Sequence, residues 1–291
     1  GYDVAKQLKE EAALRIESLV ERNVRISESI EELENAPDTP LNRYFLQQYT
    51  HMPKIEPNLT RWDNWIDINK TMLPLIIAFV VLLGISGVYS DEYASKMHGI
   101  LLTTKNGRSK LFWNKLLASC LFAAMTVIIF QVFAALLCTH VYGLPFKNTP
   151  VNSLTTFYMM PNTMWALQFY VCQLIGSLLG AIVLTAVALC ISSFCRSSLV
   201  SLFLSGVYFA LGAIWSNTFE GGFISSFASL PGELSTFSLM SLTDVLGNAK
   251  VFIVGNSAIP TAKLTMVAQA IIFIVAIILN YSFYTHKEMG A

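Results

Sequence analysis

The sequence predicts an all-α polytopic membrane protein with a helical extracytoplasmic segment ahead of its membrane-spanning part. Hydrophobic residues make up 54% of the 291-residue chain and charged residues only 13%, whereas about a quarter of a soluble domain is charged. Residues 1–71 hold nine Lys/Arg and thirteen Asp/Glu, but residues 72–291 hold ten and six. We therefore divide the chain into an extracytoplasmic helical segment, 1–71, and a transmembrane domain, 72–291.

Long apolar runs define the transmembrane domain. Each run approaches or exceeds the roughly 20 residues that a helix needs to cross about 30 Å of hydrocarbon. We expect membrane-spanning helices at about 72–89, 116–141, 165–192, 199–215 and 264–284.

Basic residues in the short loops set the orientation, because Lys and Arg are retained on the cytoplasmic side. The loop 90–115, the turn at Arg196 and the tail at Lys287 are basic. They alternate with the longer segments 142–164 and 216–263, which contain few basic residues. We expect a multi-pass membrane protein with its amino-terminal segment outside and its C-terminus in the cytoplasm.

Five spans place the amino-terminal segment outside without a visible means of reaching that side. The sequence begins at Gly1, with no initiator methionine and no signal peptide. Because unaided export of a long charged tail is uncommon, we expect an upstream span that lies outside this sequence and brings the total to six. The alternative is a five-span protein with a translocated amino end.

The amino-terminal segment contains the pattern of a long amphipathic helix over residues 3–34. Its apolar residues follow three- and four-residue steps close to the coiled-coil period: Val4, Leu8, Ala12, Ile16, Leu19, Ile26, Ile30 and Leu33. Pro37 and Pro40 end the helix. Two roles stay open, a domain that senses or guides a substrate and a packing stalk.

Several kinds of chemistry are not indicated. The five cysteines and four histidines are dispersed, and no C-x-x-C, H-E-x-x-H or G-x-S-x-G pattern occurs. We therefore expect no catalytic, cofactor or metal site in this chain, and no nucleic-acid partner. The predicted spans carry no charge well inside them, which argues against ion-coupled transport. With no Walker A pattern either, energy for any uphill movement comes from another chain.

The loop between the first two predicted spans carries its own helical pattern. Ser90 is a plausible N-cap, with Asp91 and Glu92 in the first turn, and Asn106-Gly107 is a turn signal. Between the cap and the turn, four apolar residues share one helix face: Tyr93, Met97, Ile100 and Leu101. This short helix either lies in the lipid headgroups or docks into a soluble partner.

The same loop carries a family resemblance. The order Asp91-Glu92-Tyr93, Gly99-Ile100-Leu101-Leu102-Thr103-Thr104, Gly107-Arg108 and Lys115 resembles the signature of ABC-2 type permeases. The chain departs from that pattern at Ala94-Ser95-Lys96, where the family usually has glycine. The resemblance in span order and loop lengths covers residues 72–291.

The resemblance implies the permease half of an ATP-driven exporter, with a six-span bundle. A separate cytoplasmic ABC ATPase would bind ATP and Mg and hydrolyse ATP, so this chain is not itself an enzyme. A second permease subunit, identical or different, would complete the complex in membrane lipid. The loop would be the ATPase-coupling helix, formed by Glu92, Tyr93, Met97, Ile100, Leu101 and Arg108. The expected substrate is amphipathic or hydrophobic: an antimicrobial peptide, a drug or a lipid-like molecule.

Two further features concern helix packing. The family often has short helices that dip back into the membrane from the last outer loop, and residues 222–246 fit this pattern, because Pro231-Gly232 separates two short apolar pieces. The alternative is an ordinary extracellular loop. Gly176 and Gly180 form a GxxxG motif that allows close helix contact, within the subunit or across a dimer.

Two other functions remain alternatives. One is a non-transporting membrane receptor or scaffold with the amino-terminal helix as its ligand domain. The other is a mechanotransmitting ABC subunit that acts through its outer helical segment.

Overall fold

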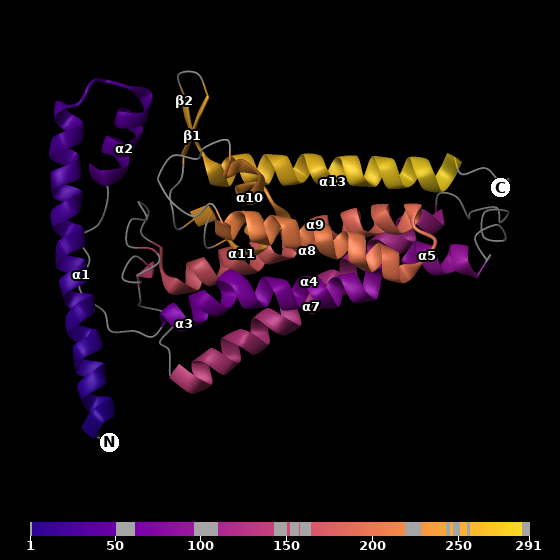
Figure 1. Cartoon of the computed structure of the whole chain (residues 1–291), viewed down its shortest axis with the longest axis horizontal. Helices are drawn as coiled ribbons and strands as arrows, with labels where there is room; N and C mark the ends of the chain where they lie inside the picture. The colour runs from indigo at the N-terminus through magenta and orange to yellow at the C-terminus, as the bar shows by residue number, and fades with distance from the viewer. Residues whose placement is uncertain are drawn as a thin grey trace.

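The protein is an all-α polytopic membrane protein built around a bundle of long helices (Figure 1). The computed structural model describes residues 2–50, 62–95, 110–142, 150–151, 157, 164–218, 228–242, 245–246, 251–254 and 257–286. Within them, five helical stretches are long and apolar enough to cross a membrane: Trp65–Glu92, Lys110–Val141, Ala166–Phe194, Ser198–Thr218 and Thr261–Tyr284. Each stretch overlaps one of the apolar runs predicted from the sequence.

The first span consists of four consecutive helical pieces: α3 (Trp62–Asp67), a π-helical turn η1 (Ile68–Met72), α4 (Leu73–Ile85) and α5 (Gly87–Ala94). A π-turn is a local widening of an α-helix that is frequent at functional sites. Asn69 is fully buried in this turn, and its Nδ2 donates to the Trp65 carbonyl at 2.9 Å. The apolar run alone could not reveal these breaks.

Helix α8 (Ala166–Phe194) is the centre of the bundle and is more buried than the other four spanning stretches in the described chain. It contacts α4, α5, α7 (Lys110–Tyr142), α9 (Ser198–Thr218) and α13 (Thr261–His286). Small side chains at its contact faces, among them Gly176, Gly180 and Ala188, permit this dense packing. The main hydrophobic core lies between α8 and its neighbours.

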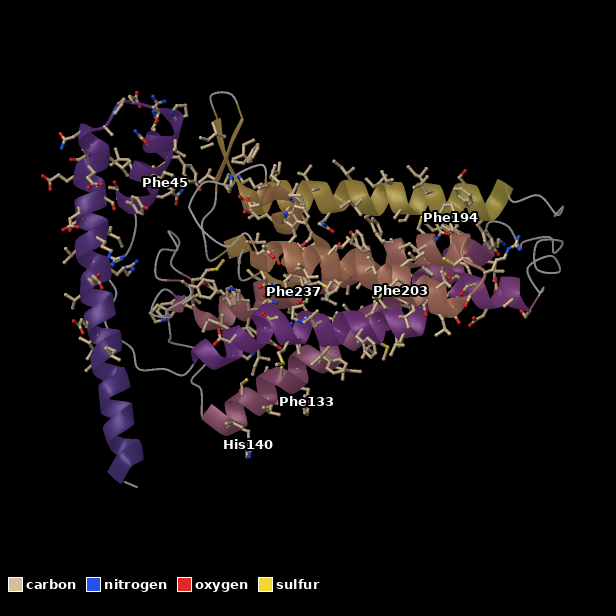
Figure 2. The ribbon with its side chains drawn as sticks, in the orientation of Figure 1. Phe45, Phe133, His140, Phe194, Phe203 and Phe237 are labelled. Atoms are coloured by element: carbon tan, nitrogen blue, oxygen red, sulfur yellow. The ribbon has the colours of Figure 1, made fainter. Side chains whose placement is uncertain are left out.

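The peripheral helices α7, α9 and α13 present large apolar side chains to the outside. Phe133 is 61% exposed and Phe203 70% exposed, whereas Phe237 is buried among the helices (Figure 2). Such extensive apolar surface on three helices suits contact with lipid hydrocarbon rather than water. Figure 1 also shows α7 slanting away from the bundle toward its Tyr142 end.

The predicted amino-terminal helix is present. Helix α1 spans Tyr2–Asn35, and α2 (Pro40–Thr50) packs back against it. Thr39 Oγ1 accepts a hydrogen bond from the Asn42 amide at 3.1 Å, which caps α2, and Pro40 occupies the first helical position, where its missing N–H costs nothing. In Figure 1 the α1–α2 pair lies crosswise beyond one end of the bundle.

A small β-hairpin was not predicted. Strands β1 (Val251–Val254) and β2 (Ser257–Pro260) pair antiparallel, with Val251 opposite Pro260. Strand β2 contacts α2 and leads directly into α13. Strands of four residues are too short for an alternating pattern to stand out, so the sequence predicts a loop over this stretch.

Two short helices follow α9 in the chain. Helix α10 (Leu230–Glu233) packs on α9, and α11 (Thr236–Ser241) packs on both α8 and α9. Pro231 lies in the first turn of α10, and Ser235 caps α11 by accepting from the Ser238 amide at 3.1 Å. Of the predicted re-entrant segment 222–246, residues 228–242 and 245–246 are described, and these two helices lie against the spans.

Candidate functional site

The junction between α4 and α5 is organised by a serine from α8. Ser192 Oγ donates to the Ser86 carbonyl at 2.8 Å and accepts from the amides of Tyr89 and Ser90, both at 3.2 Å. A hydroxyl offers one donor and two acceptor positions, so all three hydrogen-bonding positions of the buried Ser192 hydroxyl are occupied. A side chain inserted into the helical hydrogen-bond ladder is a known cause of a helix break. We call Ser86, Tyr89, Ser90 and Ser192 the α5 node.

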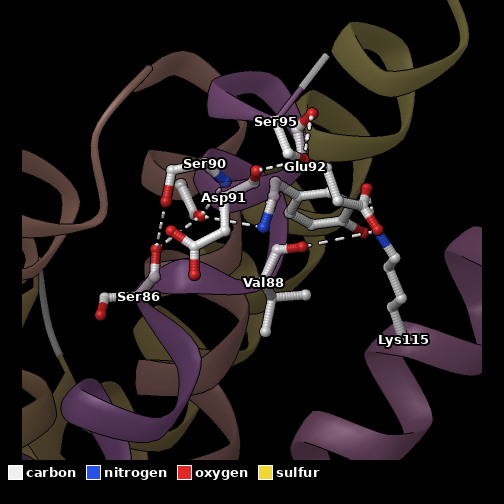
Figure 3. Close-up of polar contacts among 9 residues, drawn as sticks. Ser86, Val88, Ser90, Asp91, Glu92, Ser95 and Lys115 are labelled. Atoms are coloured by element: carbon white, nitrogen blue, oxygen red, sulfur yellow. Dashed lines mark hydrogen bonds and ion pairs between the residues drawn. The ribbon is translucent and has the colours of Figure 1, made fainter. Parts of the chain in front are cut away.

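Directly after this node, an ion pair joins α5 to α7. Lys115 Nζ pairs with Glu92 Oε2, and the two side chains are only 13% and 21% exposed. The same ammonium lies 4.6 Å from the centre of the Tyr89 ring and 5.7 Å from that of Tyr284 on α13. Lys115 Nζ also donates to the Val88 carbonyl at 3.5 Å (Figure 3).

Aromatic side chains surround the ammonium group. The Tyr89 and Tyr284 rings are fully buried, with their centres 5.3 Å apart. Phe112, one turn before Lys115 on α7, lies against Tyr284 with ring centres 6.1 Å apart. Ring faces attract a cation, more strongly where water is excluded. The ion pair and the rings together tie α5, α7 and α13 at one end of the bundle.

The predicted coupling residues are only partly within the described chain. Glu92 is paired with Lys115, as stated above. Tyr93 lies in α5, but its side chain is outside the description. The other predicted coupling residues lie outside the described residues: Met97, Ile100, Leu101 and Arg108.

The prediction that Ser90 caps a new helix is wrong. Ser90 lies inside α5, which begins at Gly87, and its hydroxyl donates to the Ser86 carbonyl at 2.9 Å. The polar run from Ser90 to Glu92 looked like a helix start because these residue types favour the first turn. The actual break comes earlier, at Ser86, whose carbonyl accepts a hydrogen bond from Ser192, about a hundred residues away in the sequence.

No family model, curated protein or solved structure matches the chain. The ABC-2 resemblance therefore rests on the loop residues and the order of the spans alone, and the function derived from it is a proposal.

A second polar cluster lies where α8 meets α11. Gln173 Nε2 and Ser177 Oγ both donate to the Met240 carbonyl, at 2.7 and 3.0 Å, and Gln131 of α7 donates to Ser177 Oγ at 3.1 Å. The side-chain oxygens of Gln131 and Gln173 are buried and have no hydrogen-bond partner among the described residues. Such orphan acceptors carry a desolvation cost, which marks this cluster as more than simple packing.

The GxxxG glycines lie on this same contact. A Cβ on Gly180 would lie 2.3 Å from Met240 Cγ, and one on Gly176 would lie 3.0 Å from the Leu239 carbonyl oxygen. Both glycines therefore bring α8 against α11 of the same chain. We call Gln173, Gly176, Ser177 and Gly180, with the Leu239–Met240 backbone, the α11 contact.

Helices α10 and α11 are also hydrogen-bonded to α13 and α9. Gln269 Nε2 donates to the Leu234 carbonyl at 2.5 Å, and Thr265 Oγ1 donates to the Glu233 carbonyl at 2.9 Å. Thr236 Oγ1 bonds both Gln269 Oε1 at 3.0 Å and the Tyr208 hydroxyl at 2.8 Å. Sequence reasoning missed these residues because single Gln, Thr and Tyr residues in apolar runs carry no spacing signal.

The described part of the chain has neither a cluster of potential metal ligands nor a disulfide. No group of three or more His, Cys, Asp or Glu side chains there could hold a metal ion. The five cysteines are free. The polar clusters described above consist of amides, hydroxyls and one ion pair, groups that can position helices and accept hydrogen bonds.

Proposed function

We propose that the chain is the permease subunit of an ATP-driven exporter that moves an amphipathic or hydrophobic molecule across the bacterial cytoplasmic membrane. The observation that carries the proposal is the Glu92–Lys115 ion pair at the base of the basic loop. It joins the last turn of the first span to the start of the second, so the two helix ends that flank the loop are held together.

Flanking helix ends that are held together suit a loop that transmits force. A docking element that is held in place before binding loses less conformational freedom on association. Movement at the loop would then reach three spans, because Lys115 lies on α7, Glu92 on α5 and Tyr284 on α13. A helix lying in lipid headgroups would not need its flanking helix ends to be held together in this way.

The polar groups within the bundle suit an amphipathic substrate. They are mild hydrogen-bonding groups, Gln131, Gln173 and Ser177, and two of the amide oxygens are unpaired among the described residues. Buried acceptors of this kind match the N–H or O–H donors of a peptide, a drug or a lipid-like molecule. A fully charged substrate would need compensating charge.

The proposal includes specific partners. A separate cytoplasmic ATPase chain would bind ATP and Mg, and a second permease subunit, identical or different, would complete the assembly in membrane lipid. In this arrangement the basic loop and the C-terminus face the cytoplasm, while the α1–α2 pair lies outside.

The test is co-purification with the candidate ATPase together with ATP turnover in reconstituted membranes. Charged substitutions in the loop, Met97→Asp and Leu101→Asp, should reduce association more than tenfold, because desolvating an unpaired carboxylate in an apolar groove costs several kcal/mol. Leu14→Asp, on the exposed side of α1, adds the same charge away from the loop and serves as the control for association with the ATPase. Wild-type association and turnover of both loop variants would contradict the proposal.

One observation favours a second candidate, the mechanotransmitting ABC subunit. Helix α2 contacts β2, β2 runs directly into α13, and Tyr284 near the far end of α13 lies beside Lys115. The amino-terminal helices are thus connected through one continuous helix to the proposed coupling loop. In that case movement would be delivered to α1 and α2, without passage of a substrate through the bundle.

A further inference from the structure

We infer that α8 moves as a rigid body and couples the position of α11 to the conformation of the α4–α5 junction. The inference deepens the proposed function, on which it rests for its purpose, by naming the route from the coupling loop to the short helices. It requires two contacts on one helix, each belonging to an element that can shift, and a stiff connection between them.

The first contact is the α5 node. Ser192 Oγ donates to the Ser86 carbonyl and accepts from the amides of Tyr89 and Ser90. All three hydrogen bonds join α8 to the α4–α5 junction, so α5 cannot shift relative to α8 without lengthening or breaking them. Movement of α5 is therefore passed to α8 through Ser192.

The second contact is the α11 contact, which depends on side-chain hydrogen bonds and close approach. Gln173 and Ser177 donate to one carbonyl, that of Met240, and Gly180 leaves no room for a side chain at that point. Helix α11 has only six residues, Thr236–Ser241, so it cannot hold its position by its own helical hydrogen bonds. Its placement therefore depends on its contact with α8, together with the hydrogen bonds from Thr236 to α9 and α13.

The connection between the two contacts is an unbroken α-helix. Ser177 and Ser192 lie on α8 with no break between them, and at 1.5 Å per residue they are roughly 22 Å apart. The helix is buried along this stretch by α4, α7, α9 and α13. A shift at one contact must therefore move the other contact or strain a close-packed interior.

Figure 1 shows the arrangement that makes this route useful: α5 lies toward one end of the bundle, and α10 and α11 lie toward the other end. Tight packing alone would not give directionality. The dependence comes from the Ser192 hydroxyl, which has no remaining hydrogen-bonding capacity, so it cannot change partners without releasing one.

The test measures each end while altering the other. Cysteine reporters are placed at two exposed positions, Ala228, just before α10, and Ala94, at the end of α5. The rate of reaction with a charged maleimide is measured on the full chain in nanodiscs, which leave both faces accessible. The chain without a reporter gives the background from its own cysteines.

Ser192→Ala should change the labelling rate at position 228 by at least about fivefold, the lower end of the usual range for coupled sites. Ser193→Ala is the matched control, because the adjacent hydroxyl is equally buried but donates only to the Cys190 carbonyl of its own helix. It should leave the rate unchanged.

Gly180→Ala should likewise change the labelling rate at position 94. Gly206→Ala, on α9, is its control, because a Cβ there has nothing within 4 Å. The inference is overturned if Ser192→Ala matches Ser193→Ala at position 228, or if Gly180→Ala matches Gly206→Ala at position 94. If one variant does not give folded, monodisperse protein, the other arm decides alone. The labelling test uses this chain without an ATPase. A negative result would therefore overturn the coupling through α8 and leave the co-purification test of the proposed function unaffected.

Discussion

Glu92 and Lys115 face each other across the base of the loop that joins α5 to α7, and their ion pair is mostly shielded from solvent. Removing one partner leaves the other charge poorly compensated. We expect Lys115→Met or Glu92→Gln alone to cost about 2–3 kcal/mol, toward the low side of fully buried pairs. The measurement is thermal unfolding in detergent.

The double variant Lys115→Met/Glu92→Gln should be less destabilised than the two single variants combined, because no uncompensated charge remains. Arg43→Met, which breaks the exposed Asp38–Arg43 pair, is the control and should shift the melting temperature much less. Strict additivity of the two single effects would show that the ion pair contributes nothing.

Gly180 leaves no space for a methyl group beside Met240. Gly180→Ala should destabilise the protein by about 1–3 kcal/mol through overpacking, despite the better helix propensity of alanine. Gly206→Ala, which meets open space, should be neutral or stabilise by up to about 1 kcal/mol. Chemical or thermal unfolding of both variants checks this, and equal stabilities would place Gly180 outside any close contact.

Thr236 Oγ1 connects α11 to Tyr208 and Gln269. Thr236→Val keeps the shape of the side chain but removes the hydroxyl, so Gln269 Oε1 loses a donor. We expect a loss of about 1–2 kcal/mol and faster amide exchange in residues 236–241. Ser216→Ala, whose hydroxyl bonds only the Ala213 carbonyl of its own helix, is the control. Unchanged exchange in the valine variant would mean that packing alone holds α11.

The corner between α1 and α2 should respond to acid. The hydrogen bond and the charge of Arg43 hold the pKa of Asp38 below its ordinary value of 3.8. The contact therefore stabilises the corner above that ordinary pKa, and this stabilisation is lost as the pH falls through the lowered pKa. Amide exchange around Asn42, corrected for intrinsic rates, should rise in acid. Arg43→Met should already show the faster exchange at neutral pH; a slow rate there would contradict the assignment.

Removing residues 3–34 separates the proposed roles of α1. If α1 guides a substrate or receives movement, export should change while ATPase association is retained, because the coupling loop is untouched. If α1 is a packing stalk, export and substrate-stimulated ATP turnover should both stay at wild-type levels in membranes that contain equal amounts of protein. A variant carrying Leu14→Ser and Val20→Ser, both at exposed positions of α1, tests its apolar side without the deletion.

Local sequence patterns predicted the elements that local physics determines. The overlap of the described spanning stretches with the predicted runs follows from bilayer thickness, and α1 follows from its helical periodicity. The end of α1 before Pro37 likewise needs only backbone sterics. These features require no knowledge of the neighbouring elements.

The polar contacts that organise the bundle could not be predicted in this way. Ser192 looks like any small residue near the end of an apolar run, and its role appears only when α8 is placed beside Ser86. The error at Ser90 has the same origin, because local residue preference indicated a cap there, whereas the break lies at Ser86, beside the distant Ser192 hydroxyl. The hairpin at 251–260 was missed because its pairing partner lies in the same short, weakly patterned stretch.

The unequal lengths of α7 and α9 have a consequence for the surrounding bilayer. At 1.5 Å per residue, α9, with 21 residues, is about 32 Å long, whereas α7, with 33 residues, is about 50 Å long. A hydrocarbon layer of about 30 Å fits α9 standing upright, but α7 fits only by tilting or by extending beyond the layer. A thicker bilayer would leave the ends of α9 mismatched first, while α7 could respond by standing more upright. Membrane thickness would therefore alter the angle between these two helices without any ligand.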